Sequence, residues 1–139
     1  MSMDNALESA VLDFILKGTD PSWRAGATQY AALVTDVGGA VDEANPIANE
    51  CTYTGYARVA LTKSSAWSGS GNSRTNASQI QWGKRTDAGA TQTATAVVIV
   101  DTSSGAVNMA MIAEMADDLA ISQNITPIVG AGDLTITAA

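Results

Sequence analysis

The stretch that most restricts the fold of this chain is TATAVVIVD, residues 93–101. β-Branched residues favour the extended backbone of a strand, and this run is the most strongly β-forming one in the sequence. ATQYAALVTD, residues 27–36, is apolar on both faces, as is typical of a strand buried on both sides. We therefore expect residues 93–101 to form a central strand and residues 27–36 to form a core strand.

Shorter segments alternate between apolar and polar residues, which is typical of half-buried strands. In SQIQWG, residues 78–83, the alternation places Ile80 and Trp82 inward. In TGYARVALT, residues 54–62, one face of the strand carries Ala57, Val59 and Leu61. The other face carries Arg58, Ala60 and Thr62.

Residues 106–116, AVNMAMIAEMA, fit two periodicities. Met109, Ile112 and Met115 would share one face of a helix, and methionine and alanine are good helix formers. Val107, Met109 and Met111 would alternate along a strand that follows a tight turn at residues 102–105. We favour the strand.

An amphipathic helix is predicted over residues 1–18. Asp4 can cap its first turn, and Gly18 is a typical residue for its C-terminal end. Its apolar face is formed by residues at spacings of three and four: Leu7, Ala10, Val11, Phe14 and Ile15. We expect Leu7, Val11 and Phe14 to be buried against the sheet or against a second copy.

The fold class expected from these segments is mostly β: an antiparallel sandwich or barrel preceded by one N-terminal amphipathic helix. At 139 residues the chain is expected to form one domain, residues 1–139, with a helix or arm at 1–18 and the sandwich at 27–139. Further extended segments are expected at 119–129 and 134–138. The acidic segment 42–50 and the polar segments 63–78 and 83–92 are interpreted as loops, the segment 63–78 with at most a brief strand.

The chemistry available to the chain is limited, because it has no histidine and a single cysteine, Cys51. Histidine is the commonest general base and metal ligand, and no phosphate-binding loop motif is present. The acids Asp42, Glu43, Asp117 and Asp118 are interpreted as solvated surface residues. We therefore expect no enzyme, no cofactor and no metal site; calcium at an acidic loop and a carboxylate-based glycan hydrolase are weaker alternatives.

The sequence also bears on where the protein works. No apolar run approaches the roughly 20 residues of a membrane span, and no signal peptide is recognisable. One cysteine excludes an intrachain disulfide framework. We therefore expect synthesis in the cytosol and no contact with a membrane.

Charge is distributed unevenly along the chain, whose formal net charge is −7. Residues 1–50 carry eight acids and two bases, and residues 87–139 carry six acids and no base. The middle segment, 51–86, carries no acid and five bases: Arg58, Lys63, Arg74, Lys84 and Arg85. These bases either offset the acidic flanks or form a patch that docks on an acidic partner. Direct binding to nucleic acid is not expected, because the chain as a whole would be repelled by phosphate.

Trp67 lies in a loop rich in serine and glycine. An exposed loop tryptophan is a candidate anchor for a protein partner or a sugar. The alternative is that Trp67 plugs one end of the β-structure. Trp82 is expected in the core, and Trp23 is expected to pack the helix onto the sheet.

Five short motifs occur in the order FILKGT, QYAALVTD, TGYARVALT, NASQIQW and GAGDLTITA. In this order they resemble small virion proteins of tailed bacteriophages, which are described as tail-fibre-like or as head decoration proteins. The resemblance spans nearly the whole chain. Members with a clear role are cement proteins with a jelly-roll fold, bound outside a capsid shell.

The resemblance implies a jelly-roll-like sandwich and a capsid cement, or decoration, function on the capsid exterior of a virion assembled in the bacterial cytoplasm. The implied partners are the major capsid protein and further copies of the chain, as a homodimer or homotrimer. The alternative is a tail or tail-fibre component, with host glycans bound through Trp67. Candidate partner contacts are the five bases, Trp67 and the helix residues Leu7, Val11 and Phe14.

Overall fold

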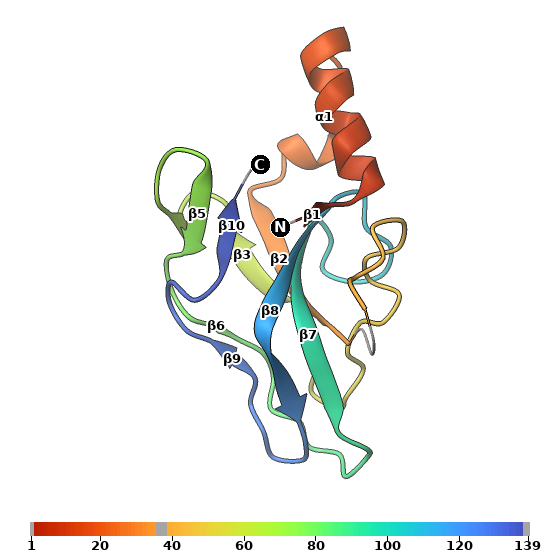
Figure 1. The fold of residues 1–139 in the computed structure, drawn as a ribbon, viewed down its shortest axis with the longest axis vertical. Coiled ribbons are helices and arrows are strands. Elements are labelled where there is room, and N and C mark those ends of the chain that lie inside the picture. Colours follow the sequence, from red (N-terminus) through yellow and green to blue (C-terminus); the bar gives the residue numbers. More distant parts are fainter. Residues whose placement is uncertain (1, 36–38, 138–139) are drawn as a thin grey trace.

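A five-stranded antiparallel sheet forms the centre of the fold in the computed structural model, which describes residues 2–35 and 39–137 (Figure 1). Two smaller antiparallel sheets pack beside it. The helical elements are α1 (Asn5–Lys17) and the 3₁₀ helix η1 (Ser22–Arg24). The strands are β1 (Ser2–Met3), β2 (Thr28–Val34), β3 (Val59–Thr62), β4 (Trp67–Ser68), β5 (Ser73–Asn76), β6 (Ile80–Gln81), β7 (Gln92–Val100), β8 (Ala110–Ile121), β9 (Ile128–Val129) and β10 (Thr135–Thr137).

The strand order confirms which segments are central. The large sheet runs β1-β8-β7-β2-β3, and the small sheets run β10-β5-β4 and β6-β9. The segment rich in β-branched residues is β7, which lies in the middle of the large sheet between β8 and β2. The expected antiparallel sandwich is therefore observed, and none of the described sheets closes into a barrel.

One face of the large sheet packs on the two small sheets. Leu33 of β2 and Val97 and Ile99 of β7 are fully buried there, in one cluster with Ile80 and Trp82. The Trp82 indole Nε1 donates a hydrogen bond to the carbonyl of Ala31, 3.0 Å away. The alternation in residues 78–83 thus predicted Ile80 and Trp82 as core residues correctly.

The opposite face of the large sheet is covered by loops. Val34 of β2 and Val98 of β7 are buried in a second cluster, to which residues 39–50 and 101–109 contribute side chains: Val41, Ile47, Val107. The backbone N–H of Val41 also donates to Glu114 Oε1 of β8, 2.9 Å away. We name these two loop segments the loop layer. Because both faces of the sheet are covered, β2 and β7 are apolar at successive positions.

Three sequence expectations are corrected or resolved. Residues 106–116 contain the start of β8, so the strand is confirmed over the helix. The loop 63–78 contains two short strands, β4 and β5, which pair with each other. The strand expected at 54–62 begins only at Val59, and Arg58 is buried instead of facing outward.

Two glycines explain the late start of β3, because the backbone crosses itself there. A Cβ atom placed on Gly83 would lie 1.9 Å from the carbonyl oxygen of Gly55. One placed on Gly55, whose φ is +102°, would lie 2.3 Å from the carbonyl oxygen of Lys84. Such a close crossing admits only glycine, and it diverts residues 54–58 from the strand path.

Candidate docking surface on the N-terminal helix

The buried carboxylate of Asp4 links the base of helix α1 to the large sheet. Asp4 Oδ1 accepts from the backbone N–H of Leu7, 2.9 Å away, which caps the helix as the sequence predicted. The same oxygen accepts from the N–H of Ala110 in β8 at 3.0 Å, and the Asp4 N–H donates to the Ala110 carbonyl at 3.0 Å. Asp4 is 4% exposed. These bonds join the first turn of the helix to the large sheet.

Replacing Asp4 by alanine is expected to lower the free energy of unfolding by about 2 kcal/mol, because a helix cap is lost and the buried Ala110 N–H loses a partner. Urea unfolding measures this loss. The control is Asp13→Ala, which removes only an exposed ion pair with Lys17 and should change stability by less than about 0.5 kcal/mol. A loss for Asp4→Ala as small as that of the control would show that the base of the helix is not anchored by this residue.

Beyond its first two turns, α1 projects away from the sandwich (Figure 1). Among the described residues of α1, only Leu7 is buried. Val11 is half-buried, and Phe14 is 43% exposed. Burial against the sheet is therefore observed for Leu7 alone, and burial of Val11 and Phe14 against a second copy stays a prediction. The periodicity is that of an amphipathic helix, but the sheet reaches only its base.

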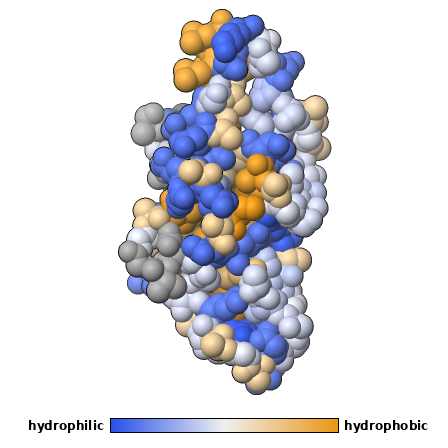
Figure 2. Space-filling view, turned by 90° about the vertical axis from the view of Figure 1, so that its right-hand side faces the viewer, coloured by the Kyte–Doolittle hydropathy of each residue, from blue (hydrophilic) through white to orange (hydrophobic). Residues whose placement is uncertain are grey.

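The free end of α1 is apolar. Leu12, Ile15 and Leu16 are 56%, 67% and 76% exposed, and their spacings of three and four residues place them on one side of the helix. Figure 2 shows hydrophobic atoms at this end of the molecule. We call these three residues the helix tip.

Phe14 lies on a different side of the helix and has a partner. The Arg24 guanidinium lies 5.3 Å from the centre of the Phe14 ring, a cation–π distance, and Arg24 also pairs with Asp20. Gly18 ends the helix in the left-handed conformation, with φ of +69°, as the sequence predicted. Contacts from the segment after the helix therefore cover Phe14 in part but leave the tip free.

A groove of about 350 Å³ opens beside the base of α1. Its walls come from the start of the helix and from both segments of the loop layer, which lie on the right of Figure 1. The apolar side chains that line it are Ala6, Ala44, Pro46, Ile47, Ala106 and Val107. We call it the base groove. Figure 2 views the molecule from this side and shows a second hydrophobic area at mid-height, below the end of the helix.

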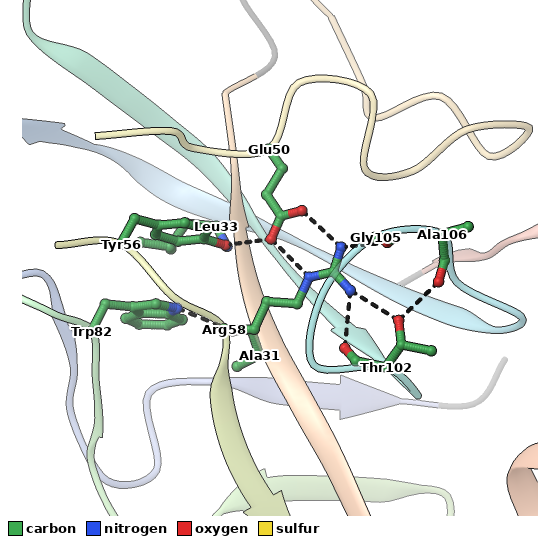
Figure 3. A network of polar contacts seen from close by, with 9 residues as sticks. All are labelled: Ala31, Leu33, Glu50, Tyr56, Arg58, Trp82, Thr102, Gly105 and Ala106. Carbon is green, nitrogen blue, oxygen red and sulfur yellow. Dashed lines mark hydrogen bonds and ion pairs between the residues drawn. The ribbon is translucent and has the colours of Figure 1, made fainter. Parts of the chain in front are cut away.

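The basic residues have different environments, and Arg58 is an internal residue (Figure 3). Its Nε and Nη2 donate to the two carboxylate oxygens of Glu50, both at 2.8 Å. Its remaining bonds go to the Thr102 carbonyl at 2.9 Å, the Thr102 hydroxyl at 3.0 Å and the Gly105 carbonyl at 2.8 Å. Hydrogen bonding to Glu50 raises the pKa of Arg58. The Tyr56 hydroxyl also donates to Glu50, at 2.8 Å.

Arg85 is internal as well. It is 2% exposed, and its Nη1 donates to the carbonyls of Ala90 and Ile121 at 2.9 and 2.7 Å. Its Nε and Nη2 donate to Asp87 Oδ1 at 3.0 and 2.6 Å. The hydrogen bond from Arg85 holds the pKa of Asp87 well below its usual range. Arg58 and Arg85 thus fix loops within the chain, and the expectation that they face a partner is corrected.

The other three bases differ in exposure. Lys84 and Arg74 are exposed, although Arg74 donates to the carbonyls of Gly71 and Ser73 in its own hairpin. Lys63 is half-buried, and its Nζ donates to the carbonyl of Trp23, 2.6 Å away. A docking role for these three residues stays a prediction.

Trp67 is half-buried and packs against the main core cluster, with its indole N–H directed at Gln29 Oε1, 3.3 Å away. Trp67 lies in the short strand β4 and is packed in part into the core, and its role as a partner or sugar anchor stays a prediction. The acids Asp42, Glu43, Asp117 and Asp118 are exposed. Within residues 2–35 and 39–137, no group of three or more His, Cys, Asp or Glu side chains is placed to hold a metal ion.

Burial raises the pKa of the Cys51 thiol to about 12, with a smaller contribution from the Glu50 carboxylate. Cys51 is 3% exposed. Among the described residues, no helix has both the length and the apolar character to cross a membrane.

The arrangement is that of a structural protein, in which the polar side chains fix loops and the exposed apolar residues gather on a projecting helix. A family model described as podophage GP4 fiber I protein gp80 matches residues 2–137. The chain therefore belongs to this family and is a structural protein of a bacteriophage virion. A search of curated proteins gave no match.

Proposed function

We propose that the chain is a non-enzymatic fibre component of the phage tail that makes its protein contacts through the helix tip. The observation that carries the proposal is the projection of α1, with Leu12, Ile15 and Leu16 more than half exposed. Exposed apolar side chains grouped in this way mark interaction surfaces. The description of the family as a fibre protein supports a place in the tail.

Capsid cement, which the motif resemblance implied, differs from this proposal mainly in location. Copy number separates the two, because virion parts follow the symmetry of the structure that they decorate. We expect about three to eighteen copies per purified particle for a tail component, in line with low-order cyclic symmetry. Quantitative mass spectrometry against the major capsid protein measures the number.

Electron microscopy of particles labelled at this protein is the second measurement. Label at the tail would support the fibre proposal. Hundreds of copies per particle, with label over the head, would contradict it and indicate a cement protein bound to the major capsid protein.

A further inference from the structure

We propose that a groove along the open edge of β8 binds an extended, basic segment of another protein, which adds as a strand between β8 and the small sheets. This inference goes beyond the proposed function, because the groove shares no residue with the helix tip. Three features of the described residues carry it: an unpaired strand edge, an apolar groove beside that edge and the charge of the groove wall.

The outer edge of the large sheet is open along most of β8. β1 pairs with β8 only at Met111 and Ile112. Next to this pairing, the backbone of Ala110 exchanges hydrogen bonds with Asp4. Because backbone groups alternate along a strand, the N–H and C=O of Glu114 point to the same outer side as those of Ala110. No backbone group of residues 2–35 and 39–137 pairs with them there, so this edge is a template for an added strand.

A bulge extends the unpaired part of β8. Glu114 and Leu119 of β8 pair with Ala96 and Ala94 of β7, so residues 115–118 oppose a single residue of β7. A bulge of this kind leaves its residues without ladder partners. The unpaired backbone of the bulge is therefore continuous with the open edge at Glu114.

A groove of about 560 Å³ lies between this part of β8 and residues 128–135, which include β9 and the start of β10 (Figure 1). We call it the seam groove. It reaches the main core, because Val97 and Leu134 line it and are buried in the main cluster. Met115 is half-buried beside them, and Ile128 is 45% exposed. The groove therefore offers apolar surface to alternate side chains of an added strand.

The charge of the seam groove selects the partner. Of the described residues that line it none is basic, and four are acids: Glu114, Asp117, Asp118 and Asp133. Within the described part of the chain, no Lys or Arg forms an ion pair with any of these four. A second copy is a poor occupant, because two paired β8 edges would bring like charges together. A strand that carries Lys or Arg between its apolar residues complements the groove.

Peptide binding tests the proposal. The probe is a fluorescein-labelled peptide of about eight residues that alternates valine and lysine, long enough to span the open edge at about 3.3 Å per residue. By fluorescence anisotropy at low salt we expect saturable binding, with a Kd that rises about tenfold or more in the double variant Asp117→Asn/Asp118→Asn. The matched control is Glu8→Gln/Asp20→Asn, which removes the same charge from exposed residues outside the groove and should change the Kd by less than about twofold.

Two further peptides separate strand addition from charge attraction alone. The valine–lysine peptide N-methylated at every residue has no N–H donor for a ladder, and a peptide with glutamate in place of lysine has the wrong charge; both should bind about tenfold more weakly or not at all. Hydrogen exchange followed by mass spectrometry should show that the unmodified peptide protects the amides of residues 114–118.

Equal affinity for the methylated peptide, protection confined to other parts of the chain, or the absence of saturable binding would each overturn the proposal. Tail location and copy number would still test the fibre proposal independently.

Discussion

Replacing Arg58 by alanine is expected to lower the free energy of unfolding by about 3–5 kcal/mol, the range for removing one partner of a buried ion pair. The Arg58 side chain is 2% exposed and that of Glu50 is 19% exposed. The substitution leaves Glu50 without its cation and leaves the carbonyls of Thr102 and Gly105 without their donor. Urea unfolding followed by tryptophan fluorescence measures the change.

The matched control is Arg74→Ala. Arg74 is exposed, and its two hydrogen bonds stay within its own hairpin, so the change should be within about 0.5 kcal/mol. If both variants lost the same small amount, the network around Glu50 would not hold the loops in solution. A docking role for Arg58 would then have to be considered again.

Gly83→Ala is expected to destabilise the fold by about 3 kcal/mol or more, at the upper end of the range for overpacking. The added methyl group would lie 1.9 Å from the Gly55 carbonyl oxygen. The obstacle is backbone, so it cannot move aside as the end of a flexible side chain can. Thermal unfolding followed by circular dichroism gives the change in Tm.

Gly26→Ala is the control for this substitution. A Cβ atom there would meet its nearest atom, the Trp23 carbonyl oxygen, at 3.8 Å, which is ordinary van der Waals contact. This change should be neutral or slightly stabilising, because alanine restricts the unfolded chain more than glycine does. Equal Tm values for Gly83→Ala and the wild type would mean that the two backbone segments do not cross so closely.

Features set by neighbouring residues were predictable from the sequence. Asp4 and Gly18 mark the two ends of α1. They could be recognised because a helix cap depends only on residues next to the helix in sequence: a side chain that accepts a hydrogen bond at the start and a left-handed glycine at the end. The run of β-branched residues predicted β7 for a similar reason. Even the fit of residues 106–116 to two periodicities could be resolved, since the preceding tight turn favours a strand.

Features that depend on distant residues were not predictable in the same way. Arg58 turns inward because Glu50 and Thr102, 8 and 44 residues away, supply its acceptors, and alternation alone places it outside. The exposure of Phe14 escaped prediction because a helical periodicity shows which side is apolar but not what covers it. The base groove combines residues 4–6, 43–47 and 106–107, and no local pattern indicates such a site.

The loop layer has a consequence for how sequences in this family can diverge. Loops usually accept substitutions and insertions more readily than the strands they join. Here Val41, Ile47 and Val107 cover one face of the large sheet, so their segments are under the same packing constraint as a strand. Insertions should instead accumulate in the β4–β5 turn, where Gly71 has no atom within 4 Å of its Cβ position. In related phages, diversity is therefore expected at that hairpin, with the loop layer nearly constant in length.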